Sequence, residues 1–175
     1  MTTSAAITSA TVPTGSWAIV PRNSTAAFAV RNFGVKTVRG IVPIRDATVV
    51  VTGDRQVAEV HATLDLAAID TANGRRDKDL RKRHLLDTQQ YPDLVFDCAD
   101  VRESAGGWAL AGTLTARGAT TPVQLTAEVA GGPANGLLAV RACTSLDRRE
   151  LQITAPRFMI GHQVLVEITA QFRLS

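Results

Sequence analysis

The sequence lacks several features that define large classes of protein. Aromatic residues make up only 5% of its 175 residues, and no stretch approaches the roughly 18 consecutive apolar residues that a membrane-spanning helix needs. The two cysteines, Cys98 and Cys143, form no C-x-x-C pair, which disfavours a redox motif or a cysteine metal site. Cys98 shares an alternating face with Phe96, so we expect it to be buried. The sequence predicts no integral membrane segment.

An excess of charge of one sign is also missing. Nineteen basic and sixteen acidic side chains leave a net charge of +3, which is too small to argue for a nucleic-acid partner. The most charged stretch, residues 67–87, alternates in sign, whereas a nucleic-acid stripe is normally of one sign and interleaved with aromatic residues. We interpret this stretch as one short amphipathic helix with Thr71 as its N-cap and His84 at its end.

Residues 1–14 lack the basic start and the continuous apolar core of a secretory signal. We interpret them as a flexible leader that precedes one domain, residues 15–175. With no export signal, we expect the protein in the cytoplasm with reduced thiols.

Most of the chain shows apolar residues at every second position. Residues 57–69, 122–130 and 163–174 alternate cleanly, and turns that contain glycine or proline separate most such runs. Eight or more short strands with one apolar face each, and no alternating helices, indicate an all-β antiparallel sandwich or barrel. A single closed sheet is favoured because closure removes unpaired edges.

Residues that could carry out chemistry are few. His61, His84 and His162 share no metal-ligand spacing, and neither a G-x-S-x-G motif nor a glycine-rich phosphate loop occurs. The sequence therefore predicts no catalytic residues, no metal and no required cofactor. An enzyme that uses a buried acid–base pair stays the second hypothesis.

Two blocks follow the order and spacing of a known family. "IDTANGRRDKDLRKRHLLDTQQYPDLVF" (69–96) and "GTLTARGATTPVQL" (112–125) resemble the signatures of the YceI-like, polyisoprenoid-binding protein family. The opening "WAIVPRNSTAAFAVRNFGVKTVRG" (17–40) resembles its first strands, so the resemblance covers about residues 16–174. A late R-x-D-F-G-I motif departs as "RRELQI", which keeps Arg148 but has Glu150, Leu151 and Gln152 at the next family positions.

The resemblance implies an elongated, lipocalin-like barrel of about eight strands with one short helical crossover. It also implies that the lumen holds a lipophilic molecule, an isoprenoid quinone or prenyl lipid, for transport or storage, and that the protein is a homodimer. An accessory or enzymatic role on such a molecule is the alternative, and a third hypothesis is a ligand-free barrel with a dry core. The residues expected to line the lumen are Phe28, Val30, Val38, Val42, Leu64, Leu66, Phe96, Leu110, Leu114, Leu125, Val166, Ile168 and Ala170.

Polar residues near one end of the barrel leave two interpretations open. They could lock the crossover through caps, an Asx-turn and an Arg–Asp pair, or they could contact a ligand headgroup. For Arg148, which alternation points inward, we expect Asp70, Asp77 or a headgroup as partner, because an unpaired buried charge is costly. The residues concerned are Asp70, Asn73, Arg76, Asp77, Arg81 and Arg148.

Overall fold

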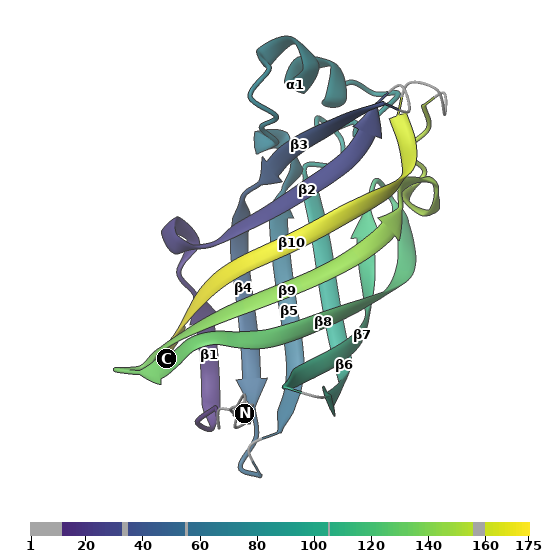
Figure 1. Cartoon of the computed structure of the whole chain (residues 1–175). Helices are drawn as coiled ribbons and strands as arrows, with labels where there is room; N and C mark the ends of the chain where they lie inside the picture. Colours follow the sequence, from purple (N-terminus) through teal and green to yellow (C-terminus); the bar gives the residue numbers. More distant parts are fainter. Residues whose placement is uncertain (1–11, 33–34, 55, 105, 156–159) are drawn as a thin grey trace, which may run out of the picture.

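The computed structural model describes residues 12–32, 35–54, 56–104, 106–155 and 160–175. All its strands belong to one sheet, and every pairing between them is antiparallel (Figure 1). The strands are β1 (Gly15–Ile19), β2 (Thr25–Asn32), β3 (Lys36–Val42), β4 (Ile44–Val51), β5 (Val57–Asp65), β6 (Asp93–Ser104), β7 (Gly107–Ala116), β8 (Ala119–Ala134), β9 (Leu137–Asp147) and β10 (Ile160–Leu174).

Strand β10 closes the sheet into a barrel. It pairs with β9 along one side and with β1 on the other, so that eight strands follow the order β1-β4-β5-β6-β7-β8-β9-β10 and return to β1. The all-β barrel of about eight strands is therefore confirmed. The β2–β3 hairpin is an extension of this ring, because β2 pairs with the upper part of β10 and β3 pairs with β2.

The strands form where the sequence alternates. Along β8, Ala119, Thr121, Val123 and Leu125 are buried, and the residues between them are exposed. Successive side chains of a strand point to opposite faces, so this pattern puts one face of each strand inside the barrel and the other in water.

The crossover between β5 and β6 contains helix α1 (Gly74–Leu80), after the short 3-10 helix η2 (Leu66–Ala68). The N-cap of α1 is Asn73, whose Oδ1 accepts from the Arg76 backbone N–H at 3.0 Å. The prediction of Thr71 as N-cap is wrong, because Asp77 binds the Thr71 side chain instead. The helix is also shorter than expected, since His84 lies in the turns after Leu80. Two further 3-10 helices are η1 (Pro21–Asn23) and η3 (Arg148–Leu151).

Buried apolar residues form two clusters, one toward each end of the barrel. The cluster near the chain termini includes Trp17, Val51 and Phe172, and the cluster nearer α1 includes Phe96 and Leu151. Cys98 belongs to the second cluster, as its alternation with Phe96 predicted, and burial raises the pKa of its thiol. Both cysteines are free.

The predicted leader lies mostly outside the described residues, which begin at Val12. Val12 is buried within the cluster near the chain termini, and the Thr14 hydroxyl donates to the Thr52 carbonyl at 2.9 Å. The chain thus contacts the barrel three residues before the expected domain start, and a leader over residues 1–11 stays a prediction. Within the part of the chain that the structure describes, no helix is both long enough and apolar enough to cross a bilayer.

Candidate ligand-binding cavity

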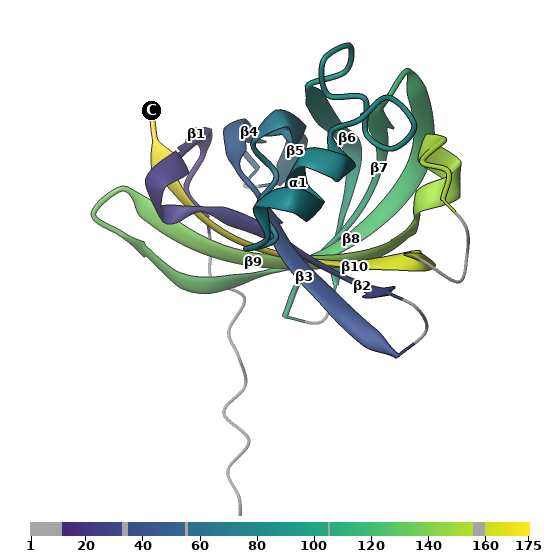
Figure 2. The same cartoon turned by 90° about the horizontal axis from the view of Figure 1, so that it is seen from above.

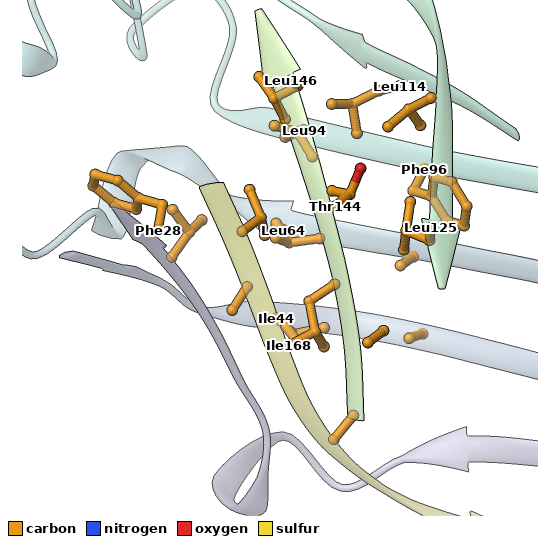
Figure 3. A pocket seen from close by; sticks show the side chains of 18 of the residues that line it. Phe28, Ile44, Leu64, Leu94, Phe96, Leu114, Leu125, Thr144, Leu146 and Ile168 are labelled. Carbon is orange, nitrogen blue, oxygen red and sulfur yellow. The ribbon is translucent and has the colours of Figure 1, made fainter. Parts of the chain in front are cut away.

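A cavity of about 310 Å³ runs through the barrel interior. Every strand of the closed ring contributes side chains to its wall, β1 through Ile19. Figure 3 shows Leu64, Phe96 and Ile168 pointing into it from different strands. Nearly all of the lining side chains are hydrocarbon. Among the described residues that line it, only Thr144, Arg148 and the indole of Trp108 bring side-chain nitrogen or oxygen to the wall. The cavity therefore suits a flexible apolar molecule.

The structure places the predicted lumen residues on this wall, with one exception. Val38 does not line the cavity, and its prediction is corrected. It lies opposite Val30 in the half of β3 nearer the hairpin turn, whereas Val42 at the other end of β3 does line the cavity. Contact of the others with a ligand stays a prediction. The predicted residues that line the cavity are Phe28, Val30, Val42, Leu64, Leu66, Phe96, Leu110, Leu114, Leu125, Val166, Ile168 and Ala170.

Sequence reasoning missed part of the wall. Alternation in the same strands also predicts Val60, Val123 and Val164, all of which line the cavity. Val12 contributes from a segment that had been interpreted as leader, and no pattern in the sequence indicates this role.

The end of the cavity near the termini is sealed by packing. Trp17 is 0% exposed, and its indole N–H donates to the Pro13 carbonyl at 3.0 Å. Val12, Val51 and Phe172 pack in the same cluster. Hydrocarbon surfaces in close contact therefore close this end.

The opposite end is covered by the crossover, residues 66–92, which we call the lid. Figure 2 shows α1 lying across this mouth of the barrel, between β3 and β6. Leu80, Leu85 and Leu86 of the lid line the cavity at this mouth. The narrow apolar stripe of the lid thus forms the roof of the lumen.

Hydrogen bonds hold the lid in its own shape. The Thr71 backbone N–H donates to Asp77 Oδ1 at 2.9 Å, and the Thr71 hydroxyl donates to the same oxygen. Arg76 Nε donates to Thr71 Oγ1 at 2.8 Å, and Asp70 Oδ1 accepts from the Ala72 N–H at 2.8 Å in an Asx-turn. These contacts agree with the structural interpretation of the polar residues. The expected Arg–Asp pair is corrected. The Thr71 hydroxyl lies between the side chains of Arg76 and Asp77 and bonds to both.

Two backbone hydrogen bonds fasten the lid to the barrel, and Arg81 adds two hydrogen bonds that stay within the lid. Arg81 Nε donates to the Ala67 carbonyl at 2.7 Å, and its Nη2 donates to the Ile69 carbonyl at 2.9 Å. Ile41 of β3 and Asp70 of the lid exchange two backbone hydrogen bonds of 2.8 and 3.0 Å. These bonds explain why Arg81, offered as a headgroup candidate, points at the chain rather than at the lumen.

Arg117 is a fastening residue that sequence reasoning missed. It occupies the two-residue turn between β7 and β8 and donates to the Arg83 carbonyl of the lid at 2.7 Å and to the Gln152 carbonyl. Positive φ at both Arg117 and Gly118 matches the turn that a two-residue hairpin needs. The sequence "ARGA" between two alternating runs signals this turn but not its contacts.

Arg148 is buried, with 3% of its surface exposed, and lines the cavity. Its guanidinium donates to the backbone carbonyls of Gly161 at 3.0 Å, Ile153 at 2.6 Å, Ala155 at 2.9 Å and Ile160 at 2.8 Å. The expected partners Asp70 and Asp77 are wrong, because Asp77 is bound to Thr71 and Asp70 to Ala72. Burial lowers the pKa of Arg148 from its ordinary value. Its contacts tie the end of β9 to the start of β10.

The histidines lie apart. His61 contacts Asp97 on the outer face of β5 and β6, and His84 is exposed on the lid. Among the residues that the structure describes, no three histidine, cysteine or acidic side chains come together as a metal site.

The sequence of this chain is similar to that of a known family and of several bacterial proteins. A family model described as YceI-like domain matches residues 17–172. A UPF0312 protein of Photorhabdus laumondii is 36% identical over 73 residues, which are 42% of this chain and 38% of that protein. A UPF0312 protein of Serratia proteamaculans is 34% identical over 73 residues, again 42% of this chain and 38% of that protein. The matched segment thus spans well under half of these curated relatives.

Solved structures share the fold. BcnA of Burkholderia cenocepacia aligns with a TM-score of 0.78 at 14% identity, over 87% of this chain and 98% of that one. A polyisoprenoid binding domain from Saccharophagus degradans, implicated in plant cell wall breakdown, aligns with a TM-score of 0.67 at 14% identity, over 91% and 98%. The YCEI protein of Campylobacter jejuni aligns with a TM-score of 0.69 at 18% identity, over 81% and 87%.

Proposed function

The chain belongs to the YceI-like domain family, and from that premise we propose that it binds a lipophilic molecule of the polyisoprenoid type in the barrel lumen, as a carrier or store. The observation that carries the proposal is the apolar cavity between the packed end at Trp17 and the lid. The neighbour from Saccharophagus degradans, described as a polyisoprenoid binding domain, supports the same ligand class.

The chemistry of the wall favours a long aliphatic chain over a flat polar molecule. Burial of each methylene-sized group contributes about 0.8 kcal/mol, so a few prenyl units reach micromolar affinity after ordering costs. The Thr144 hydroxyl donates to the Gln124 carbonyl, and Arg148 donates to four backbone carbonyls. Since these two polar side chains already have partners, the lumen selects for the hydrocarbon tail and tolerates different headgroups.

The experiment that tests the proposal is native mass spectrometry of freshly purified protein, followed by extraction and identification of the bound lipid. We expect a non-covalent adduct that releases a prenyl lipid. Protein that carries no adduct and binds no added prenyl lipid would support the ligand-free barrel. Turnover of the extracted molecule would instead support the enzyme.

A substitution within the wall sharpens this test. Ala170 is buried on the inner face of β10, so Ala170→Trp fills the lumen, at a cost of about 1–3 kcal/mol in stability from overpacking. The matched control is Thr169→Trp, on the exposed face of the same strand. We expect lipid to be lost only from the first variant. Ala62→Leu is a milder plug for use if Ala170→Trp does not fold, and unchanged lipid content in the folded plug variants would contradict a lumen site.

Two finer expectations belong to the same proposal. We propose that the protein works as a homodimer, which light scattering at micromolar concentration tests, and a monomer alone would contradict it. We also propose a cytoplasmic location, which fractionation of the native cells tests.

A further inference from the structure

The lid has two chemically different sides. Leu80, Leu85 and Leu86 face the cavity, whereas Arg75, Lys78 and Arg83 are exposed on the outside. A short segment with one apolar and one basic side is typical of elements that bind at a membrane surface. In this protein the apolar side is already in use as the roof of the lumen, so only the basic side is available to a partner.

The basic side carries a net positive charge after internal contacts are counted. Residues 75–83 contain six basic and two acidic side chains. Arg76 and Arg81 are bound to oxygens of the lid itself, and Asp77 is buried against Thr71. Among the described ion pairs, only Lys82 with Asp79, at 2.7 Å, involves this stretch. The exposed charge left in residues 75–83 is basic. Elsewhere in the lid Asp70 is exposed and Asp87 is half-buried, so the lid as a whole keeps an excess of basic side chains.

The tip of the β2–β3 hairpin adds an apolar residue at the same end of the barrel (Figures 1 and 2). Val35 is 84% exposed, and Arg31, Lys36 and Arg39 beside it are exposed as well. The bridge between Ile41 and Asp70 joins this hairpin to the lid. An apolar side chain that projects among basic ones can enter the headgroup region of a bilayer while its neighbours contact anionic lipid.

The opposite end of the barrel has no such excess among its described residues. Its exposed charges are mixed, with Arg102 paired to Asp100 and Arg141 paired to Glu128. Asp54 and Glu103 are exposed there too. The basic surface is therefore particular to the end where the lid covers the lumen.

We propose that the lid end, consisting of the outer side of the lid and the Val35 tip, docks on an anionic lipid bilayer, where the lumen ligand enters and leaves. The inference rests on the proposed function, because a molecule too apolar for water passes best between two touching apolar phases. The exposed side chains supply charge complementarity to anionic headgroups, worth roughly a fivefold gain in affinity per basic residue near the surface. Displacement of the lid on the bilayer opens the cavity from its roof.

The test measures co-sedimentation of the full chain with vesicles of phosphatidylcholine, with and without phosphatidylserine. We expect binding to the anionic vesicles only, and loss of that binding at high salt. The variant Arg75→Gln/Lys78→Gln/Arg83→Gln removes the exposed lid charges and should weaken binding on the order of a hundredfold. The matched control Arg102→Gln/Arg141→Gln/Arg173→Gln removes as many charges at the opposite end and should leave binding unchanged.

The outcomes separate this proposal from the function on which it rests. Lipid in the lumen without vesicle binding overturns the docking surface and leaves lipid binding intact. Vesicle binding by a protein that holds no lipid overturns the lumen site alone. Equal loss in the two triple variants, or binding to neutral vesicles at any salt, overturns the docking proposal, as does retention on duplex DNA with no binding to vesicles. Val35→Asp, which leaves the basic residues in place, should also weaken anionic vesicle binding.

Discussion

The two ends of the barrel are closed in different ways. At the end near the termini, Trp17 and Val51 are almost fully buried in a hydrocarbon cluster. At the lid end, the hydrogen bond from Arg117 to the Arg83 carbonyl and the Ile41–Asp70 bridge hold the lid above an apolar space. Packing of large side chains contributes several kcal/mol per residue, whereas each hydrogen bond contributes about 1 kcal/mol. We therefore expect the first end to open only with the whole fold. We expect the lid, although its leucines are also buried, to open more readily.

The largest expected effect comes from removal of the packed end. Trp17→Ala should lower the free energy of unfolding by about 3–5 kcal/mol, because it leaves a cavity where the indole was fully enclosed. Chemical denaturation of the ligand-free protein measures it. Trp17→Phe is the control, since it keeps most of the ring and loses mainly the bond to Pro13. A loss under about 1 kcal/mol for Trp17→Ala would contradict the proposed rigidity of this end.

The next effect tests the carbonyl contacts of Arg148. Arg148→Met should lower the stability of ligand-free protein by about 3 kcal/mol, because four carbonyl bonds to a charged donor are lost together. The control is Arg149→Met, next to it but exposed, for which we expect less than about 1 kcal/mol. If the ligand-free melt is unchanged and only lipid binding weakens, Arg148 is a headgroup residue after all.

A smaller and local effect is expected within the lid. Thr71→Val keeps the volume but removes the hydroxyl between Arg76 and Asp77, at a cost of about 1–2 kcal/mol. Backbone amides of the lid, such as that of Asp70, should exchange hydrogen faster, and those of the strands near Trp17 should not. The control is Thr120→Val on the outer surface of β8. Uniformly faster exchange across the barrel would contradict an independent lid.

The smallest effect depends on pH. Arg149 donates a side-chain hydrogen bond to Asp147 and holds the pKa of that carboxyl well below its ordinary value of 3.8. A carboxylate whose pKa is lowered by folding stabilises the folded state above the ordinary pKa, and this contribution is lost as pH falls below it. The difference in melting temperature between the protein and Asp147→Asn should therefore be present at neutral pH and shrink below about pH 4. A difference that is constant across that range would show that the charge is not responsible.

Alternation of apolar residues predicted an antiparallel sandwich or barrel and the apolar face of each strand, because each strand has a side-chain period of two. The eight-stranded barrel with a lumen was predicted from the family resemblance. Val38 was misplaced although its own strand alternates well. Its exclusion depends on where along β3 the hairpin leaves the cavity, since Val42 of the same strand lines it, and this is set by how distant strands pair. Local pattern and tertiary pairing are thus separate sources of information.

The lid was harder to predict than the wall. Thr71 and Asn73 are both good N-cap residues, and burial of Asp77 beside Thr71 decides between them. The inward direction of Arg148 was predictable from alternation, but its partners are backbone carbonyls, which every residue carries. The same holds for Arg117, whose partner carbonyls lie 34 and 35 residues away in the sequence.

The place of β10 in the ring also determines the order in which this chain can fold. The Gln171 backbone N–H donates to the Ser24 hydroxyl 147 residues earlier, and Val164–Thr169 pairs with Thr25–Val30. At ordinary rates of synthesis, on the order of ten seconds separate the appearance of these partners at the ribosome. During that interval β1 and β2 have no β10 to pair with, so we expect the nascent barrel to expose its apolar interior until β10 is made.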